Sequence, residues 1–468
     1  MSASMTIQAL SADAVHRTAM PLNAAGGTQR TRFLFFTGQA TLDLVLLAIA
    51  FSIADLIRHG TLGASIDQTS LVVILPLYAV AAFNAGVYSY ETAMSLSRAI
   101  GRMTTALVIA LGADLLFWFG AKSAGEFSRM VFFVGAGLSL VLLTAARVPA
   151  VRLARHNLGI RFMRRVLVID RQPIEAPEGF EVLDAEAMQL VPDIANPIML
   201  HNFSNLVAGA DRVVVSCPPE RRENWAVYLK GVGCWGELLV PELHGVAPVR
   251  HERDSALVGV RVSVGPLSVR NRILKRMLDL AITVPTIVLL TPVLLLTAVA
   301  IRLDSPGPIL FRQRRMGRGN RLFDVYKFRS MRNERTDHDG ARSTSRDDDR
   351  ITRVGRLIRT TSIDELPQLF NVLEGDMSLV GPRPHALGSV AGTQLFWQVD
   401  QRYWLRHAVK PGITGLAQVR GHRGATDHED DLINRLRSDL EYLASWTIYR
   451  DVHILLRTMF VLVHKNAY

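Results

Sequence analysis

Residues 277–301 read MLDLAITVPTIVLLTPVLLLTAVAI, an apolar run that is long enough to cross a bilayer. A helix needs about 20 apolar residues to span the hydrocarbon core. Pro285 and Pro292 lie inside the run, and proline removes a backbone donor and kinks or breaks a helix. The segment is therefore predicted to be a membrane helix that is broken at Thr291-Pro292.

Both flanks of this segment are basic, which bears on its topology. The preceding cluster is Arg270, Arg272, Lys275 and Arg276, and the following one is Arg302, Arg312, Arg314, Arg315 and Arg318. Basic clusters stay in the cytoplasm, and a spanning helix would leave one of them outside. A re-entrant helix that breaks and returns keeps both inside and is the favoured prediction. The alternative is a Pro-kinked transmembrane helix, because prolines also occur in such helices.

Four more long apolar segments lie upstream, at residues 33–57, 70–90, 103–120 and 130–150. Arginines gather before the first, between the second and third, and after the fourth, which places the N-terminus and everything after residue 150 in the cytoplasm. The sequence predicts a four-helix transmembrane bundle over residues 31–155, after a disordered arm over residues 1–30. Four helices of a soluble bundle would show polar faces, and these segments have almost none.

The overall composition of the 468-residue chain agrees with a membrane part joined to soluble parts, since 49% of its residues are hydrophobic. Its net charge of +11 could serve nucleic acid, anionic lipid or phosphorylated substrates. No nucleic-acid-binding motif accompanies the charge, so lipid and phosphate are favoured and nucleic acid is not expected. The two cysteines, Cys217 and Cys234, lie in the predicted cytoplasmic part and are expected to be reduced and structural.

Residues 156–265 have the pattern of a small Rossmann-like α/β domain. The strand candidates are residues 166–170, 212–216 and 237–241, with helix-like stretches near 185–190 and 218–233. This alternation favours a largely parallel sheet. A nucleotide site would need a glycine-rich turn after the first strand, but Asp170-Arg171-Gln172-Pro173 stands there. The domain is therefore interpreted as structural or regulatory.

Residues 266–468 contain the groups that suit phosphate chemistry. Residues 309–313 and 322–329 alternate like two strands around a turn, and residues 333–350 are polar enough to form a mobile loop. Ser362-Ile363-Asp364-Glu365 fits a capping box, with Ser362 as N-cap and Glu365 reaching back. Residues 410–419 contain glycines that suit either a nucleotide pocket or a bulged hairpin.

The capping interpretation accounts for Glu365 better than for Asp364. A carboxylate in a first helical turn is stabilised as an anion by the helix dipole, which suits a nucleophile or a Mg²⁺ ligand. Arg359 lies close upstream, and the rigid turn Gly381-Pro382-Arg383-Pro384 presents a guanidinium that can grip phosphate oxygens.

These residues together resemble the polyprenyl-phosphate hexose-1-phosphate transferases, the bacterial sugar transferase family. The motifs that carry the resemblance lie between about residues 270 and 468. They are Lys275-Arg276 with Asp279, Thr291-Pro292, Tyr326-Lys327-Phe328-Arg329-Ser330-Met331, Ser362 to Leu369, Gly381 to Pro384, and Pro411 to Val419. Gly421 to Gly424 with Asp439 to Tyr442 is most similar to the undecaprenyl-phosphate glucose phosphotransferase branch.

The resemblance implies a monotopic catalytic core on a re-entrant helix and a two-step reaction with Mg²⁺. Asp364 would attack the sugar-bearing phosphate of a UDP-sugar, UMP would leave, and undecaprenyl phosphate would then take the hexose 1-phosphate. Asp364 and Glu365 match the catalytic acids, with Asp364 also the expected metal ligand. The residues expected to bind phosphate or substrate are Arg359, Arg383, Lys327, Arg329, Lys275 and Arg276.

The expected protein is thus a multi-pass phosphoglycosyl transferase of the bacterial inner membrane, with its catalytic domain at the cytoplasmic face. Its partners would be bilayer lipid, the two substrates and downstream glycosyltransferases of surface-glycan synthesis, and large relatives suggest a homodimer. Glucose 1-phosphate is the favoured cargo. Galactose or N-acetylhexosamine donors, or a non-catalytic scaffold for polysaccharide assembly, stay open. Leu416 stands where many relatives have Trp and Arg420 where Asn is common, which leaves selectivity open.

Overall fold

The computed structural model describes residues 23–60, 68–120, 128–156, 163–243, 258–265, 267–331, 350–422, 426 and 428–463. These residues form two compact units, one between residues 21 and 164 and the other from residue 165 onward. Residues 1–22 of the expected disordered arm lie outside the described residues, as do the expected mobile loop up to residue 349 and the end of the Gly421 to Gly424 motif.

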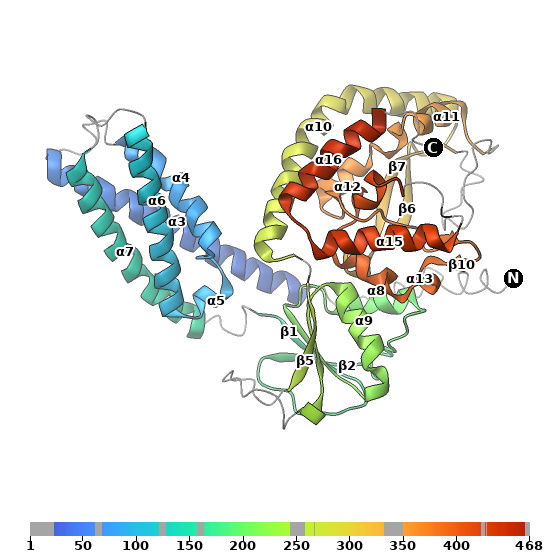
Figure 1. Ribbon diagram of the computed structural model, residues 1–468, viewed down its shortest axis with the longest axis horizontal. Coiled ribbons are helices and arrows are strands. Elements are labelled where there is room, and N and C mark those ends of the chain that lie inside the picture. Colours follow the sequence, from blue (N-terminus) through green and yellow to red (C-terminus); the bar gives the residue numbers. More distant parts are fainter. Residues whose placement is uncertain are drawn as a thin grey trace. The chain divides into compact units, whose positions relative to one another are not determined.

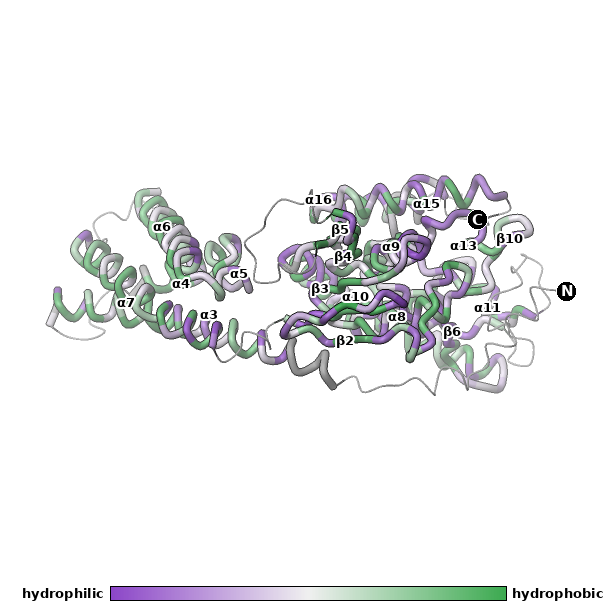
Figure 2. Tube along the Cα trace, turned by 90° about the horizontal axis from the view of Figure 1, so that it is seen from below, coloured by the Kyte–Doolittle hydropathy of each residue, from purple (hydrophilic) through white to green (hydrophobic). Residues whose placement is uncertain are grey.

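The first unit consists of the helices α3 (Asn23–His59), α4 (Gln68–Ala85), α6 (Leu96–Gly120) and α7 (Arg129–His156), with the short α5 (Tyr90–Ala93) (Figure 1). Figure 2 shows that their residues are mostly hydrophobic. By length and composition α3, α6 and α7 could each cross a membrane, whereas the apolar part of α4, Leu71–Ala85, is shorter. The four predicted helices are confirmed. α3 begins at Asn23, within the last part of the predicted N-terminal arm.

An ion pair lies inside this unit. Arg147 on α7 contacts Asp43 on α3 at 2.5 Å, and both side chains are almost fully buried. The hydroxyl of Tyr88 also donates to Asp43, at 2.9 Å. Charged residues in an apolar bundle are normally paired in this way, because an unpaired charge in an apolar environment is very costly.

The second unit begins with a five-stranded sheet in the order β2-β1-β3-β4-β5. The bounds of these strands are β1 Arg165–Ile169, β2 Phe180–Asp184, β3 Arg212–Ser216, β4 Trp235–Leu239 and β5 Gly259–Val264. Only β5 is antiparallel to its neighbour, so the prediction of a largely parallel sheet is confirmed. The helices of this domain are α8 (Pro197–Leu206), α9 (Arg222–Val232) and the 3₁₀ turns η2 (Pro219–Arg221) and η3 (Pro241–Leu243).

The helix expected near residues 185–190 is wrong. The chain forms turns after β2, because the Asp184 carboxylate accepts hydrogen bonds from the amides of Glu186 and Ala187 at 2.9 and 3.1 Å. Such local side-chain bonds compete with helix formation. At the carboxyl end of β1, Asp170 accepts from Arg221 and from the Trp225 indole at 2.9 and 2.8 Å. This carboxylate is therefore engaged within the α/β domain.

Helix α10 (Val269–Asp304) follows, and it is also long and apolar enough to cross a membrane. The expected break at Thr291-Pro292 is not observed, since one helix continues through both Pro285 and Pro292. Figure 1 shows that α10 bends strongly along its length. Proline can kink a helix without ending it, and Ser and Thr side chains often bind the backbone close to such a kink. The hydroxyls of Thr286 and Thr291 donate to carbonyls one turn earlier, at 2.7 and 2.8 Å.

The rest of the unit packs around short strands. β6 (Leu310–Met316) and β7 (Leu322–Phe328) form the expected antiparallel hairpin around η4 (Arg318–Asn320). The helices are α11 (Arg353–Thr360), α12 (Gln368–Glu374), α13 (Phe396–Val399), α14 (Leu416–Val419), α15 (Glu429–Ala444) and α16 (Ile448–Val463), with the 3₁₀ helices η6 (Ile363–Glu365) and η7 (Gln401–Ala408). The small strands β9 (Val390–Ala391) and β10 (Gln394–Leu395) pair with each other.

The turn Gly381–Pro384, which we call the arginine turn, is fixed by a close approach of two chain segments. It follows β8 (Ser378–Val380), which pairs in parallel with β11 (Gly412–Thr414). Of the two alternatives for residues 410–419, the bulged hairpin is therefore wrong. A Cβ at Gly412 would lie 2.1 Å from the Gly381 nitrogen, and one at Gly381 would lie 2.4 Å from the Lys410 carbonyl oxygen. Only glycine allows this contact, which holds the arginine turn in one position.

Candidate active site

Asp364 and Glu365 lie in a single 3₁₀ turn, η6, between α11 and α12. The predicted capping box is wrong: Ser362 has φ of 56°, and its side chain makes no capping hydrogen bond. α12 begins only at Gln368, directly after Pro367. Because Ser362 adopts the left-handed conformation, the chain reverses before the acids and turns the Glu365 carboxylate toward other elements. Glu365 is therefore not a cap.

The Glu365 carboxylate is held by two cations. Lys327 Nζ on β7 donates to Glu365 Oε1 at 3.0 Å, and Arg383 of the arginine turn donates to the same oxygen at 2.5 Å. The Glu365 and Lys327 side chains are each 17% exposed. Burial disfavours the charged form of Glu365, but Arg383 and Lys327 outweigh it and hold its pKa well below the usual range. Glu365 is thus a fixed anion.

Asp364 differs from its neighbour. Its half-buried carboxylate has no hydrogen-bond partner within the part of the chain that the structure describes. Burial raises its pKa above the ordinary value, with Lys327 opposing this effect and Glu365 adding to it. A helix dipole would lower the pKa of Asp364, but burial has the larger effect and raises it. An unpaired carboxylate beside two cations can attack a phosphorus atom without first breaking a bond to the protein.

Two further arginines lie near the acids. The charge of Arg359, near the end of α11, acts on Asp364 and favours its ionised form. Arg315, on β6, was not predicted as a site residue; its guanidinium donates to the Pro384 carbonyl at 2.6 Å. Burial lowers the pKa of Arg315 to about 10, and the neighbouring charge of Arg383 adds to this. Little in the sequence singles out Arg315 as a site residue, because it is one of several arginines in and around β6.

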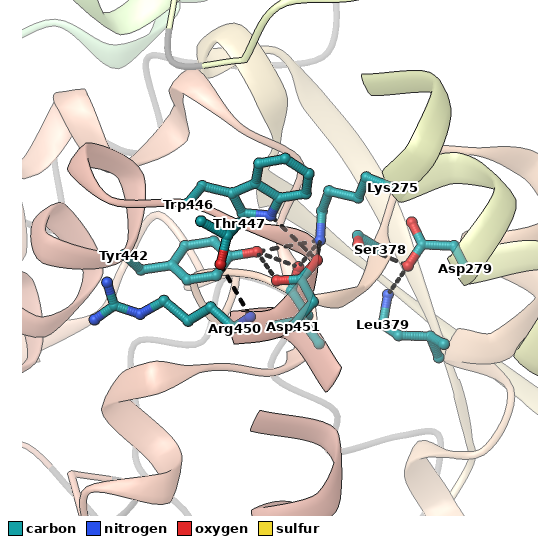
Figure 3. Close-up of polar contacts among 10 residues, drawn as sticks. Lys275, Asp279, Ser378, Leu379, Tyr442, Trp446, Thr447, Arg450 and Asp451 are labelled. Carbon is teal, nitrogen blue, oxygen red and sulfur yellow. Dashed lines mark hydrogen bonds and ion pairs between the residues drawn. The ribbon is translucent and has the colours of Figure 1, made fainter. Parts of the chain in front are cut away.

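Lys275 is not brought to the acids. Its buried Nζ instead contacts Asp451 at 2.6 Å and the Tyr442 hydroxyl at 3.1 Å (Figure 3). It also donates to the Val380 carbonyl at 2.8 Å. Asp279 forms no ion pair with Lys275 or Arg276, although it follows them closely in the same helix. It accepts instead from Ser378 Oγ and the Leu379 amide, because α10 runs directly beside β8. Lys275 and Asp279 therefore fasten the membrane helix to the strand that precedes the arginine turn.

Arg276 and Arg329 bind the ends of helices. Arg276 donates to the Val372 and Leu373 carbonyls at the end of α12. Arg329 donates to the Ser305 and Pro306 carbonyls just after α10, at 2.6 and 2.7 Å. Cations at helix C-termini satisfy carbonyls that have no partner in the helix. Of the predicted phosphate-binding residues, the structure thus groups Lys327, Arg359 and Arg383 around the acids, and it places Lys275, Arg276 and Arg329 elsewhere.

A narrow crevice adjoins Arg383. It is lined by Arg383, Gly415, Ala417, Gln418, His422, Arg435 and Asp439. Gln418 Oε1 is buried there without a hydrogen-bond partner in the described structure. Of the two positions at which selectivity was left open, Leu416 is buried in the core around α12, and Arg420 pairs with Glu441 on α15.

Comparison with known proteins identifies the family. The family model described as bacterial sugar transferase matches residues 270–465. An undecaprenyl-phosphate glucose phosphotransferase of Komagataeibacter xylinus is 53% identical over 194 residues, which cover 42% of this chain and 36% of that protein. The exopolysaccharide production protein PSS of Rhizobium leguminosarum bv. phaseoli is 47% identical over 187 residues, which cover 40% of this chain and 94% of that protein.

A third relative is named for another sugar. The UDP-N-acetylgalactosamine-undecaprenyl-phosphate N-acetylgalactosaminephosphotransferase of Aeromonas hydrophila is 46% identical over 189 residues, which cover 40% of this chain and 43% of that protein. The chain thus matches less than half the length of two of these three relatives, but nearly all of the Rhizobium protein. The chain belongs to the bacterial sugar transferase family.

Proposed function

We propose that this protein transfers hexose 1-phosphate, with glucose 1-phosphate as the favoured cargo, from a UDP-sugar to undecaprenyl phosphate. The observation that carries the proposal is the Asp364 carboxylate, which no described residue hydrogen-bonds, beside Glu365, Lys327 and Arg383. The arrangement supplies a nucleophile and fixed positive charge for phosphoryl transfer, in which positioning and charge neutralisation provide most of the catalysis. Two relatives in which this region is similar support this substrate class: one is named an undecaprenyl-phosphate glucose phosphotransferase, and the other is named for a UDP-N-acetylgalactosamine donor.

The reaction divides into two displacements at one phosphorus atom. An Asp364 oxygen attacks the sugar-bearing phosphorus of the donor, the bond from that phosphorus to the bridging oxygen breaks, and UMP leaves with the electron pair. An oxygen of undecaprenyl phosphate then attacks the aspartyl phosphosugar, and the Asp364 carboxylate leaves. No net proton transfer is needed in either step. A covalent carboxylate intermediate replaces one difficult step by two easier ones.

The surrounding cations are assigned to the phosphates. Arg383 holds Glu365 with both terminal nitrogens and can direct its remaining N–H donors to the donor phosphates, while the charge of Arg359 acts on Asp364. Lys327 binds Glu365 and keeps this anion from repelling the incoming phosphate. Glu365 therefore serves mainly to orient these two cations.

The acids also suit a divalent cation. Mg²⁺ at phosphate sites is held by one or two carboxylates together with substrate oxygens. No group of three or more His, Cys, Asp or Glu side chains within the described ranges could hold a metal alone. Asp364 and the donor phosphate oxygens would therefore hold Mg²⁺ together, and the ion would neutralise charge on the phosphates.

A release assay tests the proposal and the choice of donor. Purified protein with undecaprenyl phosphate and Mg²⁺ is expected to release UMP from UDP-glucose faster than from UDP-galactose, UDP-N-acetylglucosamine or UDP-N-acetylgalactosamine. EDTA is expected to stop the release, and added Mg²⁺ to restore it. Fastest turnover with an N-acetylhexosamine donor would favour the alternative that the Aeromonas relative suggests. A scaffold protein would release no UMP from any donor.

We further propose that α10 enters the membrane and returns to the cytoplasmic face, in the bacterial inner membrane. The basic clusters at both ends of the helix and its strong bend support this topology. A single cysteine placed at Arg312, in a variant without Cys217 and Cys234, should resist a membrane-impermeant thiol reagent in intact spheroplasts and react after lysis. Cysteine at Arg58, in the last turn of α3, is the positive control, because the charge pattern predicts that this end of the helix faces the periplasm. Labelling at position 312 before lysis would instead show a spanning helix.

The proposed organisation has four parts: an N-terminal arm, the transmembrane bundle over about residues 31–155, the α/β domain over about 156–265, and the catalytic domain over 266–468. The bundle anchors the chain, and the catalytic domain meets the lipid substrate at the cytoplasmic face. A homodimer and downstream glycosyltransferases as consumers of the lipid-linked product complete the proposal.

A further inference from the structure

The 3₁₀ helix η7 (Gln401–Ala408) presents two faces to two different parts of the protein. With three residues per turn, side chains three positions apart lie on the same face. Trp404 and His407 therefore share one face, and Tyr403 and Arg406 share another. All four side chains are buried. A shift of η7 caused by contacts on one face should therefore also move the side chains on the other face.

The first face packs against the α/β domain. Trp404 belongs to one hydrophobic core with Phe203 and Trp225, and its indole donates to the Ile194 carbonyl at 3.0 Å. Asn320 of the β6–β7 turn lies between α9 and η7, where its side chain donates to the Trp404 carbonyl at 3.3 Å. A Cβ at Gly231 on α9 would lie 2.5 Å from Asn320 Nδ2. Asn320 is fully buried, and its two amide atoms bind the Trp404 carbonyl and His407 Nδ1, so its side chain cannot make room for a methyl group without disturbing these hydrogen bonds.

The second face holds the arginine turn. Arg406 Nε and Nη2 contact Asp439 Oδ2 at 2.9 and 2.7 Å, and Nη2 also donates to the Arg383 carbonyl at 2.8 Å. Arg406 Nη1 lies 2.8 Å from His385 Nδ1, so the guanidinium is engaged on both edges. Its side chain is only 1% exposed. The main chain of Arg383 is thus held by Arg406, while its side chain is held by Glu365.

We propose that Arg406 is a positioning residue for Arg383, and that the α/β domain sets its position through η7. The inference rests on the proposed function, because the position of Arg383 matters for turnover only if Arg383 grips the donor phosphates. The Arg406 guanidinium is planar and hydrogen-bonded on both edges, so a small shift of η7 should also shift the Arg383 main chain. Misplacement of a phosphate-binding group by about an ångström is enough to weaken donor binding strongly.

Gly231→Ala tests the coupling from the far side of the interface. Alanine favours the α9 helix, but its methyl group would push against Asn320 and hence against η7. We expect KM for UDP-glucose to rise roughly 5-fold, with KM for undecaprenyl phosphate unchanged. A merely structural defect would lower the active fraction and kcat but leave KM for the donor as it was. Lys230→Ala, an exposed change on the same helix, is the matched control and should leave both constants unchanged.

A double-mutant cycle identifies the route. The dissociation constant of UDP is measured for each single variant and for the double variant. If Gly231→Ala acts through Arg383, it should change this constant little in a protein that already carries Arg383→Lys, because that substitution has already weakened the contact with phosphate. Trp404→Phe, which removes the indole donor to Ile194 without adding volume, should raise the donor KM in the same direction. Unchanged donor KM in both interface variants would overturn the proposal, as would an equal effect of Gly231→Ala with and without Arg383→Lys. Absence of UMP release from the wild-type protein would instead contradict the proposed function.

Discussion

Asp364→Asn is expected to abolish UMP release from UDP-glucose, with a loss of roughly 10⁴-fold or more. The amide has nearly the same shape as the carboxylate but cannot attack phosphorus as an anion. No described residue hydrogen-bonds the Asp364 carboxylate, so the substitution removes no acceptor from a described protein donor. The variant should therefore fold normally in the membrane. The measurement is UMP release per mole of purified protein, together with its thermal unfolding in detergent.

Asp376→Asn is the matched control for this variant. Asp376 is an exposed acid beyond the end of α12, so its neutralisation should leave turnover close to that of the wild type. Mass spectrometry of the wild-type protein with UDP-glucose, in the absence of the lipid acceptor, should detect a hexose phosphate adduct on the peptide that contains Asp364. Normal turnover by Asp364→Asn would rule out the covalent mechanism.

The pH dependence of the wild-type enzyme belongs to the same prediction. Burial raises the pKa of Asp364, with Glu365 adding to this and Lys327, Arg359 and Arg383 opposing it. The attacking form is the anion, so single-turnover UMP release should decline on acidification at a pH above the ordinary range of aspartate. The decline should follow one group, because the pKa of Glu365 is held well below its usual value and Glu365 stays charged in that interval.

Sequence patterns predicted the bundle, the parallel sheet and the acid pair, because each depends on local periodicity or on a short motif. They did not distinguish a cation that binds phosphate from one that binds the end of a helix. Lys275, Arg276 and Arg329 were assigned to substrate, yet the structure uses all three to satisfy carbonyls or a buried carboxylate. A basic residue near a motif looks the same in either role, since a helix C-terminus and a phosphate both attract positive charge.

The two acids were distinguished for a different reason from the one that the sequence suggested. A capping box was the alternative role for Glu365, but Ser362 has positive φ and makes no cap, which no local pattern indicated. Lys327 and Arg383 reach Glu365 from β7 and from the arginine turn, 38 and 18 residues away in sequence. Such contacts depend on how β7, η6 and β8 pack together, so only the folded structure could show them.

Glu365→Gln is expected to impair both turnover and stability. The carboxylate separates and orients Lys327 and Arg383, and neutralising it leaves two largely buried cations facing each other. Breaking a buried ion pair typically costs about 3 kcal/mol or more of unfolding free energy. We expect a loss of that order, and a fall in kcat of roughly 10²-fold because both phosphate-facing cations are misplaced. Glu374→Gln, an exposed change on α12, is the matched control.

The stability difference between wild type and Glu365→Gln should depend on pH with a definite sign. Since the pKa of Glu365 is depressed in the folded state, its contribution is fully present above the ordinary glutamate pKa and is lost as pH falls through the folded value. The wild-type protein should therefore unfold at a clearly higher temperature than the variant at pH 7, and the two curves should converge in strong acid. Equal unfolding temperatures at pH 7 would show that Glu365 contributes no net stabilisation through Lys327 and Arg383.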